Sequence, residues 1–140
     1  MTSQPAGDPM RRGAFRRAVE AHDLERMMAL FADDAVLHSP ITFQPFEGRA
    51  AIRQLLGIIL EVFQDFRYTD ELAAPDGSLA LVFRTRVSGR EVEGIDLVRF
   101  DASGAIRDLT VFVRPRSGIE ALLGEVAPRL ASARGAAAAP

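Results

Sequence analysis

The chain changes its hydrophobic periodicity once, near Asp65, and this change restricts the possible folds more than any other feature. Before Asp65 the apolar residues recur at intervals of three and four, which predicts helices; after it they alternate, which predicts strands. Helices that precede a series of hairpin-linked strands are typical of α+β domains. We therefore predict a curved antiparallel sheet with the N-terminal helices packed on its concave face, in the shape of a cone.

Four helices are expected, three before the strands and one after them. Their predicted positions are from Met10 to a break at residues 21–22, from the N-cap Asp23 to the pair 33–34, over residues 49–63, and around residues 119–130. In the second helix Phe31 belongs to the buried stripe, and Asp33 and Asp34 are interpreted as solvated residues at its end. Residues 36–39 are expected to be extended, and residues 40–48, which contain two prolines, to form a loop.

The second half of the chain predicts four strands separated by turn sequences. They cover residues 66–72, 79–87, 91–100 and 105–114. If the middle hairpin closes at Gly89-Arg90, Phe83 lies opposite Asp96 on the same face of the sheet. In this register Arg86 pairs with Glu93, and the two alternating arginines, Arg84 and Arg86, form charge pairs on the opposite face.

Length and composition exclude several classes of protein. At 140 residues the chain is one domain, predicted over residues 10–131 with flexible tails at 1–9 and 132–140. A net charge of −2 argues against a nucleic-acid partner, and the lack of cysteine excludes thiolate chemistry. We expect a cytoplasmic protein with no membrane association, since no apolar run reaches the length of a membrane span. Two histidines without metal-ligand spacing predict no metal site, and no cofactor-binding motif is present.

Asp96 is the strongest candidate for a chemical role. It interrupts an apolar strand, and alternation places it on the same face as Val92, Val98 and Phe100. A carboxyl group surrounded by hydrocarbon has a raised pKa and can act as a general acid, a general base or a neutral hydrogen-bond donor. The alternative is a structural aspartate bonded to a hydroxyl or a backbone amide.

His38 is the second candidate, because a neutral imidazole both donates and accepts a proton near neutral pH. Strict alternation points His38 and Ser39 to opposite faces, and a bend before Pro40 is needed to turn His38 inward. A capping or interface histidine is the alternative interpretation. His22, at the turn between two helices, is interpreted as solvated.

The runs DLERMMALFADDAVLHSP and PFEGRAAIRQLL, and later EGIDLVRFDASGAIRDLTVFVRP, resemble the SnoaL-like and ketosteroid-isomerase-like proteins. These belong to the nuclear-transport-factor-2-like superfamily, whose fold is a cone-shaped, cystatin-like roll, and the resemblance covers roughly residues 10–115. It implies the same fold here. Because the superfamily contains isomerases, cyclases, dehydratases, epoxide hydrolases and non-catalytic binding modules, the resemblance does not by itself define the reaction.

Four functional positions of ketosteroid isomerases can be transferred to this sequence by the resemblance. The carboxylate base corresponds to Ser39, the oxyanion-binding tyrosine to Phe15, a supporting tyrosine to Leu56, and the protonated aspartic acid to Asp96. Since only the last of the four groups is retained, steroid double-bond isomerisation by the family mechanism is not expected.

We therefore predict a cofactor-free acid/base enzyme of the isomerase, cyclase or dehydratase type, acting on a small apolar metabolite that is polycyclic or bears a carbonyl. Asp96 is the main proton-handling group, His38 its partner, and Ser39 a hydrogen-bonding residue. The predicted substrate-binding wall contains Phe15, Leu37, Leu56, Phe63, Phe83, Leu109, Val111 and Val113, with Phe43 and Phe46 as a lid. The alternative is a non-catalytic ligand-binding or interaction module of the same fold.

A homodimer is also predicted. Family sheets commonly pair back to back, as the resemblance implies, and alternation in the last strand places Phe112 on the outer face. An exposed aromatic residue of this kind is typical of an interface, and two-fold symmetry is the commonest arrangement.

Overall fold

The computed structural model describes residues 9–138, and side chains within residues 13–135. Its helices are α1 (Pro9–Glu20), α2 (Leu24–Ala29), α3 (Arg49–Val62) and α4 (Arg116–Ala138). Its strands are β1 (Phe31–His38), β2 (Phe46–Glu47), β3 (Gln64–Ala73), β4 (Leu79–Val87), β5 (Arg90–Phe100) and β6 (Ile106–Arg114). Both the change from helices to strands after α3 and the closing helix agree with the prediction.

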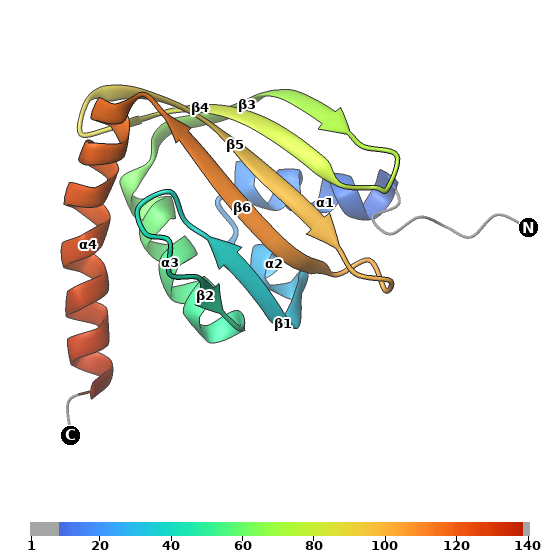
Figure 1. Ribbon diagram of the computed structural model, residues 1–140, viewed down its shortest axis with the longest axis horizontal. Coiled ribbons are helices and arrows are strands. Elements are labelled where there is room, and N and C mark those ends of the chain that lie inside the picture. The colour runs from blue at the N-terminus through green and yellow to red at the C-terminus, as the bar shows by residue number, and fades with distance from the viewer. Residues whose placement is uncertain (1–8, 139–140) are drawn as a thin grey trace, which may run out of the picture.

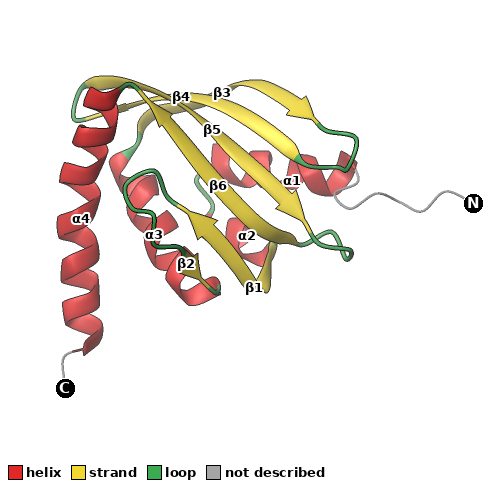
Figure 2. Cartoon of the chain, in the orientation of Figure 1, coloured by secondary structure: helices red, strands yellow, loops and turns green. Residues whose placement is uncertain are grey.

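All six strands form one curved sheet in the order β2-β1-β6-β5-β4-β3. Strands β3 to β6 form the predicted antiparallel meander, and the α+β class is confirmed. Strand β1 runs parallel to β6, so the sheet is mixed where an antiparallel one was predicted. In the chain, β1 precedes α3, and in the sheet it lies beside the last strand, β6. Helices α1 to α3 lie behind the sheet, and α4 stands at one end of the strands, against α3 (Figures 1 and 2).

The second helix is shorter than predicted, because the chain becomes extended at Phe31. The amide of Ile106 donates to the carbonyl of Leu30, 2.8 Å away. This hydrogen bond joins the chain to the start of β6, so the residues after Leu30 lie in the sheet. Asp33 and Asp34 therefore lie exposed in β1, not at a helix end. Residues 46 and 47, predicted as loop, form the short strand β2 beside β1.

The turn of the β4–β5 hairpin lies one residue earlier than predicted, with Val87 opposite Arg90, and this shifts the cross-strand pairing by two residues. Ser88 and Gly89 form the turn and both have a positive φ, 50° and 76°, as a tight hairpin of right-handed twist requires. Asp96 consequently lies opposite Leu81 and not Phe83, while Arg84 faces Glu93 and Arg86 faces Glu91. Because a shift of two residues preserves the facing of every side chain, Asp96 still points inward.

The chain ends of the described region also differ from the prediction. Pro9 is the first residue of α1, a position where its missing amide hydrogen is not needed. Helix α4 continues to Ala138, so residues 132–138 are helical where a tail was predicted; the alanine-rich sequence favours this. The rest of both predicted tails lies outside the described residues. Within residues 9–138, no helix is long and apolar enough to cross a membrane.

Candidate active-site cavity

An apolar cavity lies between the inner face of the sheet and helices α1, α3 and α4. Its volume is about 60 Å³, which is small beside the roughly 300–1,000 Å³ of pockets that enclose drug-sized ligands. Its apolar lining comes from all these elements: Phe15, Val19, Met27, Leu37, Pro40, Ile41, Leu55, Leu56, Ile59, Leu60, Phe63, Phe66, Leu109, Val111, Leu122 and Val126. Asp96, Ser39 and His22 complete the lining and are its three polar side chains.

Asp96 is held in this cavity by Tyr68. The Tyr68 hydroxyl donates to Oδ2 of Asp96 over 2.7 Å, and both residues are buried, with 6% and 9% of their surfaces exposed. Burial raises the pKa of Asp96 to about 6, and the hydrogen bond from Tyr68 partly offsets this rise. Burial and the adjacent carboxyl raise the pKa of Tyr68 well above its usual value, so Tyr68 keeps its proton and acts as the donor.

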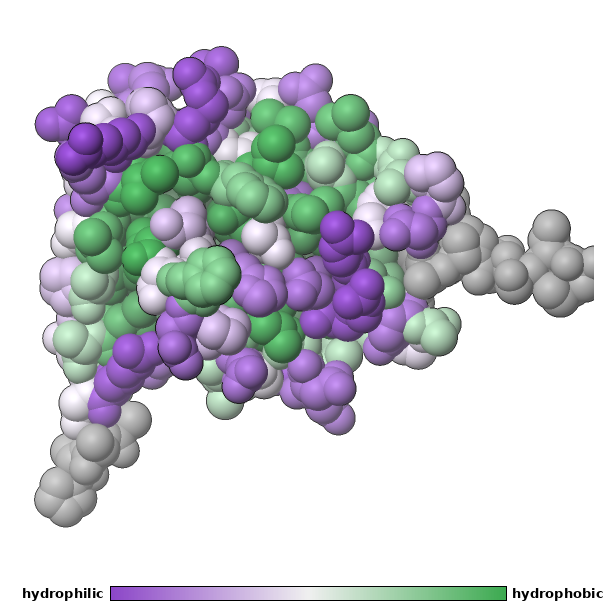
Figure 3. Space-filling view, in the orientation of Figure 1, coloured by the Kyte–Doolittle hydropathy of each residue, from purple (hydrophilic) through white to green (hydrophobic). Residues whose placement is uncertain are grey.

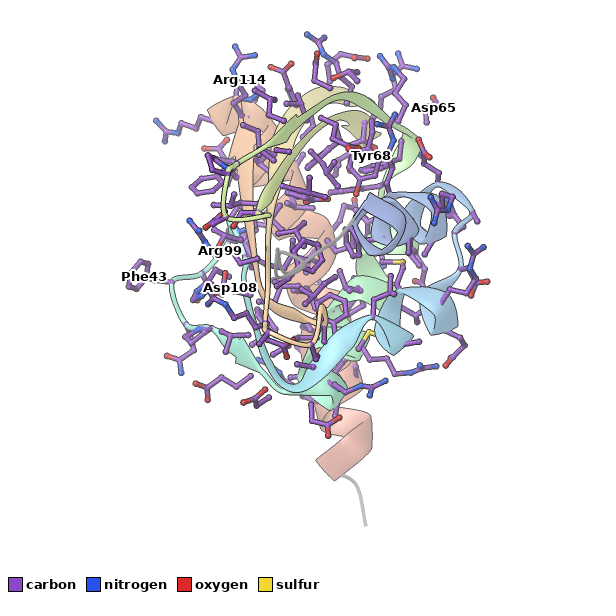
Figure 4. All side chains as sticks on the ribbon, turned by 90° about the vertical axis from the view of Figure 1, so that its right-hand side faces the viewer. Phe43, Asp65, Tyr68, Arg99, Asp108 and Arg114 are labelled. Carbon is purple, nitrogen blue, oxygen red and sulfur yellow. The ribbon has the colours of Figure 1, made fainter. Side chains whose placement is uncertain are left out.

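Sequence reasoning placed Tyr68 in a strand but assigned it no function. Its ring packs edge-on against Phe66, with 4.9 Å between centroids, and the guanidinium of Arg16 lies 5.7 Å from its centroid. Tyr68 lies on the inner side of the sheet, close to α1 (Figure 4). The available signal was that the chain's single tyrosine shares an inward strand face with Phe66.

His22 was also assigned no role, yet it lines the cavity from the α1–α2 turn. It is solvent-exposed, so it lies where the cavity meets solvent. Phe15, Val19 and His22 are spaced by four and three residues, and this spacing places all three on one side of the helical segment. The stripe is visible in the sequence, but the predicted helix break at residues 21–22 excludes His22 from it.

Ser39 lines the cavity as predicted. Its Oγ accepts a hydrogen bond from the amide of Ile41 over 3.2 Å. Because this bond uses a lone pair, the hydroxyl proton of Ser39 is left to donate. A serine hydroxyl does not ionise near neutral pH, so Ser39 supplies a hydrogen bond and no carboxylate base.

Most of the predicted wall residues line the cavity: Phe15, Leu37, Leu56, Phe63, Leu109 and Val111. Phe83 does not, because it is buried behind the lining. Its ring is stacked on Phe66 and tilted against Phe63, with centroids 5.1 and 5.7 Å away. Val113 is half-buried and also lies outside the lining.

The two lid phenylalanines do not cover the cavity. Phe43 is fully exposed and points away from the body of the molecule (Figure 4). Phe46 is buried in β2, with the Arg134 guanidinium of α4 over its ring. The predicted lid was therefore wrong for both residues.

His38 does not face the cavity, and the expectation that it partners Asp96 was wrong. Its Nε2 lies 3.1 Å from Oδ2 of Asp108, and the other oxygen of that carboxylate, Oδ1, accepts a hydrogen bond from the Thr110 hydroxyl. Alternation along β1 extends to its last residues, so Ser39 faces inward and His38 outward, with no inward bend before Pro40.

The fold and the cavity define a class of small α+β domains, and comparison with known proteins places the chain in one family. Residues 13–109 match the family described as the SnoaL-like domain, and the chain belongs to it. This confirms the resemblance found in the sequence.

Similar proteins agree with this assignment. The crystal structure of a steroid delta-isomerase from Pseudomonas aeruginosa is 39% identical, with a TM-score of 0.84 over 90% of this chain and 93% of that one. An uncharacterised bacterial protein with a cystatin-like fold, from Silicibacter pomeroyi, is 27% identical, with a TM-score of 0.82 over 88% and 86% of the two chains. A steroid delta-isomerase from Nocardioides simplex is 33% identical over 94 residues, or 62% of this chain and 73% of that protein.

Proposed function

We propose that this protein is a cofactor-free acid/base enzyme that moves a proton on a small, apolar, carbonyl-bearing metabolite, in a reaction of the isomerase, cyclase or dehydratase type. One observation carries the proposal: among the described residues, Asp96 is the one carboxyl in the cavity lining, and its pKa is about 6. A proton-transfer group works best when its pKa lies near the working pH.

The two oxygens of Asp96 have different surroundings. Oδ2 accepts the hydrogen bond from Tyr68, and this is the one hydrogen bond to the Asp96 carboxyl among the described residues. In its ionised form Asp96 takes a proton from the carbon beside the carbonyl, leaving an enolate, and then returns a proton to this or a conjugated carbon. When the carboxyl proton exchanges with solvent before this return, the substrate takes up deuterium from D₂O. One carboxyl group is sufficient for this transfer because no net proton is gained or lost.

The cavity favours a compact, uncharged substrate. Its lining is almost entirely hydrocarbon, and its volume of about 60 Å³ suits a small molecule. A polycyclic compound requires the helices to move apart. Steroids still belong among the test compounds, because two similar proteins are named steroid delta-isomerases, although Ser39, Phe15 and Leu56 replace three groups of the ketosteroid isomerase mechanism.

Hydrogen–deuterium exchange tests the proposal. A panel of small ketones, unsaturated ketones and keto-steroids is incubated with the protein in D₂O, and NMR follows deuterium entry next to the carbonyl. Asp96→Asn keeps the shape of the side chain and removes its ionisable proton, so exchange is expected to fall about 10²–10⁴-fold. Asp108→Asn is the matched control: the same substitution on the neighbouring strand, outside the cavity, is expected to leave exchange unchanged.

A non-catalytic binding module is the second candidate, and the serine at the position of the family's base favours it. If the protein is only a binding module, ligands bind to it without deuterium exchange, and wild type and Asp108→Asn bind them equally. Exchange that depends on Asp96 contradicts it.

A second copy of this chain is the proposed partner on the outer face of the sheet. Ile95 and Phe112 are cross-strand neighbours there, 36% and 54% exposed, and apolar side chains gather on this face of the molecule (Figure 3). A face of this kind is typical of a two-fold interface. Sedimentation at micromolar concentration tests the proposal: a mass of twice 15.2 kDa supports the dimer, and 15.2 kDa contradicts it.

A further inference from the structure

Tyr68 is a buried titratable residue, and its function is not explained by the cavity alone. It contacts Asp96 but does not line the cavity, so it cannot touch a bound molecule there. Its hydroxyl is buried with the carboxyl in an apolar interior, where a hydrogen bond strongly affects the orientation and ionisation of its partner.

The hydroxyl of Tyr68 reaches Asp96 across an intervening strand. Tyr68 in β3 lies opposite Phe83 in β4, and Asp96 in β5 lies opposite Leu81 in β4. Strands are about 4.8 Å apart, so the backbones of β3 and β5 are about 10 Å apart. Serine and threonine are too short to bridge this distance, whereas the length of tyrosine allows a bond of 2.7 Å.

The tyrosine ring is fixed on two sides. The ring of Phe66 meets it edge-on, and the Arg16 guanidinium from α1 lies over it. Arg16 is itself held by Glu20 and Glu71, at 3.3 and 3.4 Å. These contacts connect α1 to β3 and prevent the hydroxyl from swinging away from Asp96.

We propose that Tyr68 is the positioning residue of Asp96: it holds Oδ2, so that Oδ1 is the atom that takes and returns the proton in the cavity. The inference rests on the proposed function and adds to it a residue that does not touch substrate. It also assigns an ionisation role, because a hydroxyl donated to a carboxylate favours the charged, basic form. Without Tyr68, burial acts on Asp96 unopposed and keeps it protonated at neutral pH.

The experiment is an NMR titration of the Asp96 carboxyl carbon, in full-length protein labelled with ¹³C at aspartate. In wild type the expected midpoint is about 6. In Tyr68→Phe it is expected to rise by about one to two pH units, the equivalent of one hydrogen bond to a charged group. The kcat/KM profile of an active substrate is expected to shift by the same amount.

Thr85→Val is the matched control, because it also removes a buried hydroxyl, one that bonds the carbonyl of Gln64 over 2.8 Å. It is expected to lower stability and leave the Asp96 midpoint at about 6. If Tyr68→Phe does not fold, 3-fluorotyrosine replaces it: the chain has one tyrosine, so the label enters only at residue 68. The more acidic phenol is a stronger donor and is expected to lower the Asp96 midpoint.

An Asp96 midpoint that is unchanged in both Tyr68→Phe and the fluorinated protein overturns the inference. The titration needs no substrate, so the two proposals fail separately. Midpoints that shift as expected in a protein without any exchange activity support the positioning of Asp96 and contradict the proposed function. Exchange activity with an unmoved midpoint contradicts the role of Tyr68 alone.

Discussion

Replacing Asp96 with asparagine is expected to change how the stability of the protein depends on pH. The pKa of Asp96 is about 6 in the folded protein and 3.8 as the reference value, a difference of about two units. Each unit corresponds to about 1.4 kcal/mol, so the linked free energy is about 3 kcal/mol. Because the folded state holds the proton more tightly, this stabilisation is complete below about pH 4 and is lost as the pH rises through 6. Asp96→Asn has no proton to lose.

The free energy of unfolding, measured by urea denaturation from pH 4 to pH 8, tests this reasoning. The stability of Asp96→Asn relative to wild type is expected to rise by about 2–3 kcal/mol across the range, most steeply between pH 4 and 6. Thr85→Val, which removes no titrating group, serves as the control with a constant deficit. A relative stability that stays flat, or that falls with rising pH, refutes the assignment of Asp96 as a buried carboxyl with a raised pKa.

Three further substitutions test other parts of the structure. Gly94→Ala is expected to destabilise the protein by about 1–3 kcal/mol, since a Cβ there meets Phe83 at 2.3 Å and the carbonyl oxygen of Phe112 at 2.5 Å; an unchanged melting temperature contradicts this packing. His38→Ala is expected to leave exchange activity unchanged, because its side chain lies outside the cavity; a large loss of activity argues for an inward His38. Leu56→Ala, in the cavity wall, is expected to lower the free energy of unfolding by about 2–5 kcal/mol. It is also expected to shift activity towards larger substrates, and both the unfolding free energy and the activity are measurable on one preparation.

The inward position of Asp96 could be predicted because alternation in β5 depends only on sequence. The hairpin register could not: turns at 88–89 and at 89–90 both preserve the facing of Asp96, and the choice depends on the backbone conformation of Ser88 and Gly89. His38 illustrates the opposite error, since the local alternation was correct and the bend assumed before Pro40 was not.

The contact between Tyr68 and Asp96 could not be predicted from either strand by itself. It crosses β4 and depends on the register of two hairpins at once, and one of these has irregular pairing between Tyr68 and Asp70. The start of β1 was missed for a similar reason. Phe31 fits a helical stripe locally, but a hydrogen bond between Leu30 and the distant Ile106 places it in a strand.

The pH dependence of kcat/KM for the most active carbonyl compound tests the central claim most directly, because this profile reports the pKa of the free enzyme's essential base. If the carboxylate of Asp96 takes the proton, kcat/KM rises with pH, reaches half its maximum at about pH 6 and then stays level. Asp108→Asn shows the same profile, and Asp96→Asn shows no inflection there. A wild-type profile without an inflection near pH 6, or one that Asp96→Asn retains, contradicts the account.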